Sequence, residues 1–237
     1  MDSEGANRSE RPRVLVTGSN RGIGLELAGQ YSHDGYDVIA TCREPADAAD
    51  LRALGGTVSV HRLDVTSESD LDALAAELAG VPIDVLIGNA AVFGGARSRL
   101  AGVDRAAWSH AFAVNVIGAV QVALRLRDNV AAGTERKIVF VSSRAGLPRE
   151  AGPNRSYIYT SSKAALNAAA RNLALDLAPL GIITALVNPG HVQTRIGGAQ
   201  APMTPAESVA HVRRVIANLT AADTGKFLHF DGSELPL

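Results

Sequence analysis

Tyr159 and Lys163 suit proton transfer by type and by spacing, because they lie four positions apart in the run YTSSK. On a helix, residues i and i+4 share a face, so the amine lies one turn from the phenol. A tyrosine has a pKa of about 10 in water, and a neighbouring ammonium favours the phenolate and lowers that pKa. Tyr157 lies six residues from Lys163 and therefore on another face. The pair predicts the acid and base of a carbonyl–alcohol interconversion.

A second candidate site is the glycine-rich run TGSNRGIG, which spans residues 17–24. It follows an apolar run typical of a buried strand and precedes apolar residues at helical spacing. Glycines let backbone amides approach a pyrophosphate without a Cβ in the way, and the start of the following helix adds a favourable dipole. The position of the run therefore predicts a dinucleotide-binding turn. Its expected contacts are Gly18, Asn20, Arg21, Gly22, Ile23 and Gly24.

The end of the next apolar run, residues 38–40, indicates which dinucleotide the chain binds. In doubly wound folds an acidic side chain after this strand meets the ribose 2′-hydroxyl of NAD. Cys42 stands at that position, Arg43 follows it, and Arg21 lies in the glycine run. Two guanidinium groups suit the 2′-phosphate of NADP, which arginine binds in a bidentate fork. NADP is thus favoured over NAD, although Glu44 could reach the ribose instead, or both arginines could be solvated surface residues.

Apolar runs and helical patterns alternate along residues 13–237. This alternation predicts an α/β fold, a doubly wound, mostly parallel seven-stranded Rossmann sheet with helices on both faces. The ligand is then expected beyond the carboxyl ends of the strands. We expect a single domain over residues 13–237, with residues 1–12 as a disordered leader. Strands are predicted at 14–16, 38–40, 58–60, 85–87, 138–141, 182–187 and 227–230, and helices include 45–54, 67–78, 103–130, 157–177 and 206–219.

The glycine run also fits the TGxxxGxG pattern of the classical short-chain dehydrogenase/reductase family. Ser143 begins a Ser-x2-Gly motif, and residues 188–194 resemble the PGxVxT segment of that family. Residues 88–91 resemble its NNAG motif but depart from it at Gly88 and Ala91. The chain resembles the family from residue 13 to residue 237. Residues 161–167, 197–198 and 231–232 look like the C-factor/sniffer-type carbonyl reductase subgroup.

The resemblance implies roles for further residues. The family uses an asparagine at the place of Asn115 to hold a helix kink and a water that links the lysine to solvent. The Ser-x2-Gly motif selects Ser143 as the hydroxyl that donates a hydrogen bond to the substrate carbonyl oxygen. The implied catalytic set is Asn115, Ser143, Tyr159 and Lys163. Further implied cofactor contacts are Arg43, Asp64 (at the adenine ring, or as a helix cap), Val65, Asn89, Ala90, Tyr159, Lys163, Pro189, Gly190, Val192 and Thr194.

The loops after the fourth, fifth and sixth predicted strands should form the substrate wall. Their arginines could receive an anionic substrate, or they could be solvated loop residues. The Gly/Pro-rich stretch after Thr194 could close over the cofactor as a lid. The residues expected in this wall are Phe93, Arg97, Arg99, Arg144, Leu147, Arg149, Arg155, Tyr157, Ile196 and Met203.

The composition excludes several classes of partner. Of 237 residues, 46% are apolar and 20% are charged, and the formal net charge is -1. Neither sign dominates, so composition gives no electrostatic case for a nucleic-acid or membrane partner, and no stretch is expected to cross a bilayer. The single cysteine, Cys42, suits a reducing compartment, and we expect a cytoplasmic location. The six histidines include no pair at zinc-ligand spacing, so no metal site is predicted.

These patterns predict an NADP-dependent oxidoreductase that interconverts a carbonyl and an alcohol of a small molecule by hydride transfer. One alternative is a dinucleotide-binding signalling or regulatory protein of C-factor type with little turnover. The intact Ser143, Tyr159 and Lys163 argue against it. A second alternative is an epimerase or dehydratase with the same Tyr/Lys pair, although the short tail leaves little room for a larger substrate domain. The resemblance also implies a homodimer or homotetramer packed through the two long helices.

Overall fold

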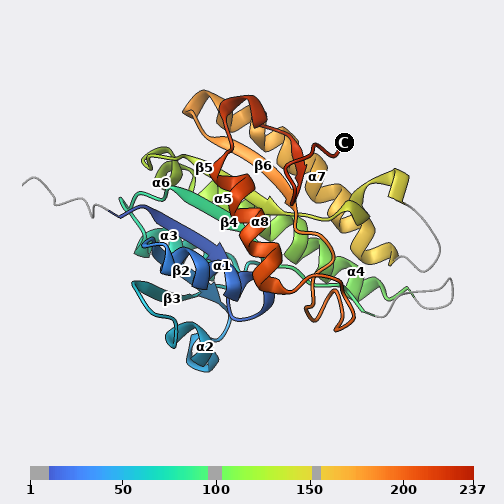
Figure 1. Cartoon of the computed structure of the whole chain (residues 1–237), viewed down its shortest axis with the longest axis horizontal. Helices are drawn as coiled ribbons and strands as arrows, with labels where there is room; N and C mark the ends of the chain where they lie inside the picture. The colour runs from blue at the N-terminus through green and yellow to red at the C-terminus, as the bar shows by residue number, and fades with distance from the viewer. Residues whose placement is uncertain (1–10, 96–102, 151–155) are drawn as a thin grey trace, which may run out of the picture.

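Seven strands form one sheet, in which every pair of neighbours is parallel (Figure 1). The computed structural model describes residues 11–95, 103–150 and 156–237. The strands are β1 (Arg13–Thr17), β2 (Asp37–Cys42), β3 (Val58–Arg62), β4 (Val85–Gly88), β5 (Lys137–Val141), β6 (Ile183–Asn188) and β7 (Phe227–His229). Their order is β3-β2-β1-β4-β5-β6-β7. The seven-stranded doubly wound sheet is confirmed, and its switch point lies between β1 and β4.

Helices cover both faces of this sheet (Figure 1). Alternate residues of a strand point to opposite faces, so Leu15 of β1 packs in one apolar cluster while Val14 and Val16 pack in the other. One cluster includes residues of α1 (Gly22–His33), α2 (Ala49–Arg52) and α8 (Pro205–Ala217). The other includes residues of α3 (Glu68–Glu77), α5 (Ala119–Arg125), α6 (Arg127–Ala131) and α7 (Tyr157–Leu177).

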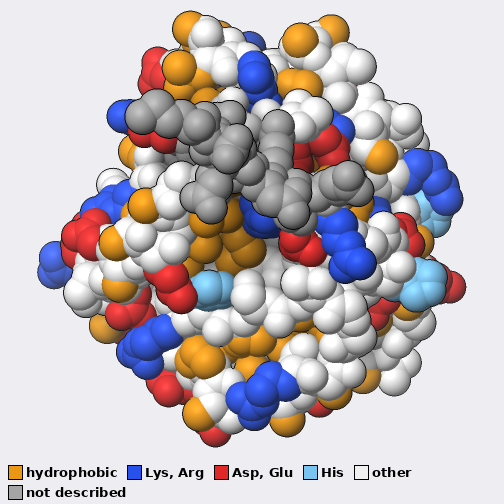
Figure 2. Space-filling view, turned by 90° about the vertical axis from the view of Figure 1, so that its left-hand side faces the viewer, with side chains coloured by type: hydrophobic (Ala, Val, Ile, Leu, Met, Phe, Trp, Pro, Cys, Tyr) orange, Lys and Arg blue, Asp and Glu red, His pale blue; other side chains and the backbone are white. Residues whose placement is uncertain are grey.

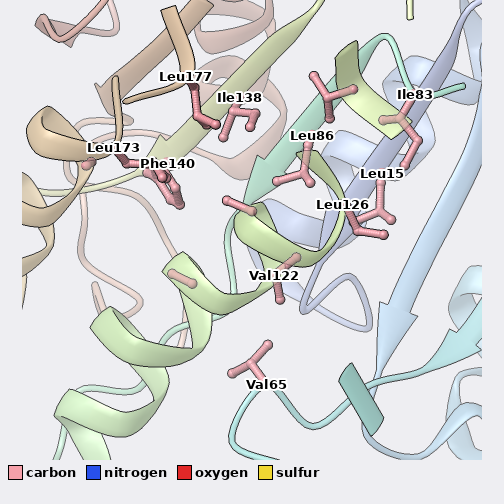
Figure 3. Packing of buried hydrophobic residues seen from close by; sticks show 14 of the residues in the cluster. Leu15, Val65, Ile83, Leu86, Val122, Leu126, Ile138, Phe140, Leu173 and Leu177 are labelled. Atoms are coloured by element: carbon pink, nitrogen blue, oxygen red, sulfur yellow. The ribbon is translucent and has the colours of Figure 1, made fainter. Parts of the chain in front are cut away.

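Figure 3 shows the second cluster, in which aliphatic side chains of the strands face those of the helices. Leu86 and Ile138 lie on β4 and β5, Val122 on α5, and Leu173 and Leu177 on α7. Both faces of the central strands are therefore buried, which explains why these strands read as continuous apolar runs. At the sheet edge, no residue of β3 is fully buried.

The helix predicted over residues 103–130 is interrupted in the structure. It begins as α4 (Arg105–Phe112), continues as a π-helical segment (Ala113–Gly118), and then forms α5 and α6 as separate pieces. A Cβ at Gly118 would lie 2.6 Å from the Val65 carbonyl oxygen, so the segment packs directly on the chain after β3. Short π-helical segments often occur at functional sites, and this one carries Asn115.

The helical run Arg105–Arg125 is long and apolar enough to cross a membrane by length and composition. This differs from the sequence expectation that no stretch meets those criteria. A helix in a protein core passes the same test, and 39% of the apolar window is buried inside the structure. Val122 and Ala123 pack in the core beneath the sheet. The finding is therefore weak support for a membrane span.

Charged side chains of both signs are interspersed on the face that Figure 2 shows. This mixture agrees with the 23 basic and 24 acidic residues of the chain. Surface ion pairs join distant segments: Arg213 of α8 contacts Asp34 at 2.6 Å, and Arg125 of α5 contacts Asp72 of α3 at 2.8 Å. The acid of each pair is about half exposed or more, and ion pairs open to solvent contribute little to stability, so apolar burial in the two clusters is the main stabilising contribution.

Asp84 ties together the amino ends of three strands. Its carboxylate accepts hydrogen bonds from the backbone amides of Arg13 and Thr134, both at 2.7 Å. Its own amide donates to the Arg13 carbonyl, and its carbonyl accepts from the Lys137 amide. Asp84 is 6% exposed, so a lost acceptor here leaves donors that water reaches poorly.

We therefore expect Asp84→Ala to lower the free energy of unfolding by about 2–4 kcal/mol, because two or more backbone donors lose their partner. Urea denaturation measures this change. Asp128→Ala is the matched control, because the Asp128 carboxylate is exposed and its ion pair within the described residues is a surface contact with Arg127. A change below about 1 kcal/mol is expected there. Equal losses in both variants would contradict the role of Asp84.

Candidate active site

The glycine-rich turn between β1 and α1 has the backbone shape that a pyrophosphate requires. Gly18 and Gly22 have positive φ angles, 65° and 55°, which side-chain-bearing residues rarely adopt. A Cβ at Gly18 would lie 2.9 Å from the Ala90 Cα, and a Cβ at Gly24 would clash with the Gly18 carbonyl oxygen. The first backbone amides of α1 point out of its amino end, toward the glycine run. No side-chain cap within the described residues accepts a hydrogen bond there. These features fit the phosphates of a dinucleotide.

Asn89 and Thr17 stabilise this turn through hydrogen bonds between the segment after β4 and the end of β1. The Asn89 side-chain amide donates to the carbonyl oxygens of Thr17 (2.9 Å) and Gly18 (3.1 Å). The Thr17 hydroxyl accepts from the backbone amides of Asn89 (3.0 Å) and Ala90 (3.1 Å). Asn89, predicted as a cofactor contact, thus also fixes the shape of the turn. Thr17 was not predicted as a site residue, although a polar residue that ends a buried strand before a glycine signals such a role.

The departure from the NNAG motif at Gly88 has a packing explanation. A Cβ at Gly88 would lie 2.8 Å from Cδ1 of Phe140 on the neighbouring strand β5. The Phe140 ring therefore occupies the space that a longer side chain at residue 88 would need. Because Asn89 keeps its bonds to the turn, the missing first asparagine does not remove the support of the glycine run.

Arginines gather beside the glycine turn. The pKa of Arg21 is lowered, first by partial burial and then by the positive charges of Arg195 and Arg43. Glu44, which could have reached a ribose, contacts Arg62 at 3.7 Å instead. Arg195 was missed by the sequence analysis, since it lies far along the chain from the glycine run.

Asp64 and Val65 follow β3 at the same edge of the sheet. The Asp64 carboxylate accepts hydrogen bonds from the amide (2.9 Å) and the hydroxyl (2.6 Å) of Thr66, so it closes a short turn. Ser67, and not Asp64, caps α3 by accepting a hydrogen bond from the Asp70 amide. The cap alternative for Asp64 is therefore wrong, while its expected contact with adenine remains a prediction.

Tyr159 lies in the first turn of α7. Ser156 caps this helix by accepting a hydrogen bond from the Tyr159 amide at 3.2 Å. The Phe93 ring packs against the Tyr159 ring with 5.2 Å between their centroids. Burial raises the pKa of Tyr159 to about 12, and a hydrogen bond with the Ser143 side chain opposes that rise. Ser143 and Tyr159 are thus brought together, and the phenol keeps its proton near neutral pH.

Lys163 is buried one turn further along α7, with an exposed fraction of 2%. Its ammonium donates to the Val141 carbonyl oxygen at 2.8 Å and lies 5.8 Å from the centroid of the Tyr159 ring. Burial lowers the pKa of Lys163 to about 8. The expected lowering of the phenol pKa by this ammonium is not found in the chain without a cofactor, where burial raises the pKa of Tyr159 and only the Ser143 hydrogen bond opposes the rise.

The Ser-x2-Gly motif follows β5 as a short 3-10 turn, Arg144–Gly146. The Ser143 hydroxyl accepts from the Ala145 amide at 3.2 Å and so starts the turn. A Cβ at Gly146 would lie 2.7 Å from the Lys163 carbonyl carbon. Glycine at residue 146 therefore lets the turn approach α7, which brings Ser143 to Tyr159.

Asn115 supports this arrangement from the π-helical segment. Its side chain exchanges two hydrogen bonds with the backbone of Val92, at 2.8 and 2.9 Å, and donates to the Ser162 hydroxyl at 2.9 Å. Asn115 therefore joins the loop after β4 to α7, beside Lys163. No hydrogen bond within the described residues links Asn115 directly to Tyr159 or Lys163.

The segment after β6 faces the glycine turn. Gly190 has a φ of 85°, and a Cβ there would lie 3.0 Å from Met203 Sδ, so the segment folds tightly on itself. Val192 pairs with Met203 through a β-bridge. Thr194 reaches back to the glycine turn, where a Cβ at Gly22 would lie 3.3 Å from its methyl carbon. The predicted cofactor segment, which includes Pro189, thus lies opposite the predicted phosphate turn.

A cavity of about 890 Å³ joins these parts, a size typical of ligand sites. It runs from Ile23 and Asn89 to Ser143, Tyr159 and Lys163. The lining residues that were not predicted include Asn188, whose side chain accepts from the Arg144 amide at 3.3 Å, and His229, which contacts Asn188 at 2.7 Å. Of the residues predicted in the substrate wall, Phe93, Arg144, Ile196 and Met203 line the cavity.

Three other residues predicted in the wall do not line this cavity. Leu147 is buried in the apolar core, because the turn after Ser143 points it inward. Tyr157 is exposed at the surface of α7, on a different side from Tyr159 as its spacing predicts. Arg149 is exposed on a short 3-10 turn. Arg97, Arg99 and Arg155 lie outside the described residues, as do residues 1–10 of the expected leader.

Arg144 faces an acid in the cavity. Its guanidinium contacts the Glu150 carboxylate at 2.8 Å, and both residues line the cavity. This pair reduces the positive charge that an anionic substrate would meet at that point. Across the described residues, no group of three or more His, Cys, Asp or Glu could hold a metal ion.

Comparisons with known proteins identify close relatives of this arrangement. Residues 12–204 match the family model described as short chain dehydrogenase. The chain is 37% identical to C-signal of Myxococcus xanthus over 164 residues, which are 69% of this chain and 98% of that protein. Its fold matches the carbonyl reductase Sniffer of D. melanogaster with a TM-score of 0.89 and 26% identity, over 96% of this chain and 100% of that one. An NADPH-bound carbonyl reductase from chicken fatty liver matches with a TM-score of 0.84, 28% identity and the same coverage.

The buried Lys163 gives a prediction about stability and pH. Below pH 8 the lysine is charged in the folded and unfolded chain, and burial costs stability. Between pH 8 and 10.5 the folded chain loses this proton while the unfolded chain keeps it, so the free energy of unfolding rises with pH. The two pKa values correspond to a rise of about 3 kcal/mol.

Urea denaturation of the chain without cofactor from pH 7 to 10.5 measures this rise. Lys163→Met removes the titrating amine, so the stability of the native chain relative to the variant should climb by about 3 kcal/mol across this range. The comparison cancels the titration of other groups. Parallel pH curves for the two proteins would show that the Lys163 amine titrates normally.

Proposed function

The chain belongs to the short-chain dehydrogenase family, and on this premise we propose that it is an NADP-dependent reductase of ketones or aldehydes. It is a nicotinamide-dependent oxidoreductase, as its family and its carbonyl reductase neighbours establish. The proposal adds the choice of NADP and the roles of individual residues. The observation that carries it is one cavity bounded by a glycine turn at one end and by Ser143, Tyr159 and Lys163 at the other.

The chain's own residues supply the proton chemistry. When bound, the reduced nicotinamide supplies the hydride that the carbonyl carbon receives. The Ser143 hydroxyl donates a hydrogen bond that holds the carbonyl oxygen. Tyr159 donates its phenolic proton to that oxygen, and a pKa of about 12 in the chain without cofactor keeps this proton available. Lys163 lies beside the phenol and stabilises the phenolate that remains.

The surroundings of the glycine turn support NADP. Arg21 and Arg43 lie close enough for each charge to act on the other, and the 2′-phosphate would offset their repulsion. Glu44, the acid nearest in sequence, contacts Arg62 at 3.7 Å. A carbonyl reductase of the same fold binds NADPH. In this proposal Asn20, Arg21 and Arg43 contact the phosphates, Asp64 and Val65 the adenine, and Ala90, Pro189, Gly190, Val192 and Thr194 the remainder of the dinucleotide.

A second candidate function comes from the similarity to C-signal. In this role the chain would bind the dinucleotide and act as a signalling or regulatory protein with little turnover. The intact Ser143, Tyr159 and Lys163 favour the enzyme, and the rate of carbonyl reduction distinguishes the two.

We also propose assembly and location. Ile117 and Leu124, on the π-helical segment and α5, and Leu175 on α7 expose apolar side chains. Apolar surface on two long helical runs supports a homodimer or homotetramer. A cytoplasmic location fits the single cysteine, Cys42, which is buried and unpaired.

Tyr159→Phe tests the proposed chemistry. Oxidation of NADPH with a panel of ketones and aldehydes should fall by at least about 100-fold, because the proton donor is lost. Binding of NADPH should persist, since the ring remains. Tyr157→Phe removes the same hydroxyl from an exposed position two residues away and should keep the native rate. Unchanged reduction by Tyr159→Phe would rule out the assigned role, and no reduction by the native chain would favour the regulatory function.

Arg43→Gln tests the choice of cofactor. Removal of the guanidinium should weaken NADPH binding by about tenfold or more, because a charge-assisted bond to the 2′-phosphate is lost. NADH lacks this phosphate, so its dissociation constant should stay within about twofold and serves as the internal control. Calorimetric titration with both dinucleotides measures the change. Equal weakening of both would show that Arg43 does not read the 2′-phosphate.

A further inference from the structure

Arg195 is the third cation beside the glycine turn. Its charge lowers the pKa of Arg21 more than the charge of Arg43 does. All three side chains are exposed, and among the described residues none of them forms an ion pair with a carboxylate. Arg43 also acts electrostatically on the Asp64 carboxylate, whereas no acid is among the causes that shift the pKa of Arg21, so the positive charge is concentrated around Arg21 and Arg195. Such a cluster is stabilised when an anion binds.

The turn that presents Arg195 has a fixed shape. The Thr194 carbonyl oxygen accepts from the Gly198 amide at 2.8 Å, and the Thr194 hydroxyl accepts from the Gly197 amide at 3.1 Å. The His191 ring contacts the Gly197 carbonyl oxygen at 2.8 Å and closes the turn from the other side. Arg195 is therefore carried by a braced turn, and its position does not depend on a loose loop.

This turn meets the glycine run at a definite point. The Thr194 methyl carbon would lie 3.3 Å from a Cβ at Gly22. Arg21 precedes Gly22 and Arg195 follows Thr194, so the two arginines are the chain neighbours of the two residues in this contact, and their charges act on each other there. Gly22 is the first residue of α1, where the backbone amides and the helix dipole attract an anion.

We propose that Arg195 binds the pyrophosphate of the dinucleotide, a role that rests on the proposed function of the chain. Arg43 lies at the end of β2, on the ribose side, and serves the 2′-phosphate. Arg21 lies between the two and serves both. The pyrophosphate is common to NADPH and NADH, so Arg195 contributes to the affinity for both cofactors and not to the choice between them. Loss of Arg195 should therefore weaken binding of both cofactors, whereas loss of Arg43 should weaken binding of NADPH alone.

Calorimetric titration of NADPH and NADH into the native chain and Arg195→Gln tests the assignment. The dissociation constants for both cofactors should rise by about tenfold or more, and their ratio should stay within about twofold. Arg195→Gln should also raise the thermal midpoint of the chain without cofactor, because one repelling charge is gone. A folding defect would lower that midpoint, so it cannot imitate the expected result.

Arg171→Gln is the matched control, since Arg171 is exposed on α7 and loses the same charge. Both affinities should stay native in that variant. Weaker binding of NADPH alone would move Arg195 to the 2′-phosphate and overturn the proposal, as would native affinities in Arg195→Gln. If the native chain binds neither dinucleotide, the proposed function fails first, and this result is distinct from a native chain that binds both.

Discussion

The buried amine of Lys163 is the constraint on which the site depends. Its hydrogen bond to the Val141 carbonyl oxygen fixes α7 against the carboxyl end of β5. Gly146 permits the close approach of the following turn, which brings Ser143 to Tyr159. A buried ammonium with one carbonyl partner is costly, and the lowered pKa of Lys163 expresses that cost. In the proposed function, this cost places a positive charge beside the phenol that donates the proton.

The charged and titratable groups around the cavity are a second feature on which the site depends. Without a ligand, the charges of Arg195 and Arg43 both disfavour the charged form of Arg21, and the Tyr159 phenol is held in its protonated form by burial. In the proposed function, the phosphates of the dinucleotide relieve the first condition, and the cationic nicotinamide opposes the second. Sites that hold unfavourable charges in this way exchange stability for function. Binding of the dinucleotide and activation of the phenol are therefore linked through electrostatics.

Local patterns in the sequence were sufficient to predict the sheet and the glycine turn. Apolar strand runs alternate with helical spacing, and the glycines of residues 18–24 are required by their own backbone angles and contacts. The break in the helix over residues 103–130 was not predictable, because it depends on tertiary contacts of Asn115 with Val92 and of Gly118 with Val65. Leu147 was wrongly placed in the substrate wall, since only the folded turn decides that it points inward. Arg195 was missed because the residues it meets lie about 170 positions earlier in the chain.

A titration of the tyrosine phenols by 13C NMR, with Tyr159→Phe to assign the signal, tests the central claim most directly. The chain has four tyrosines, so the spectrum is simple. The Tyr159 phenol should titrate at about pH 12 without cofactor. With NADP⁺ bound, its pKa should fall by about three, because Lys163 and the cationic nicotinamide then both favour the phenolate. A Tyr159 pKa that is the same with and without NADP⁺ would contradict the account.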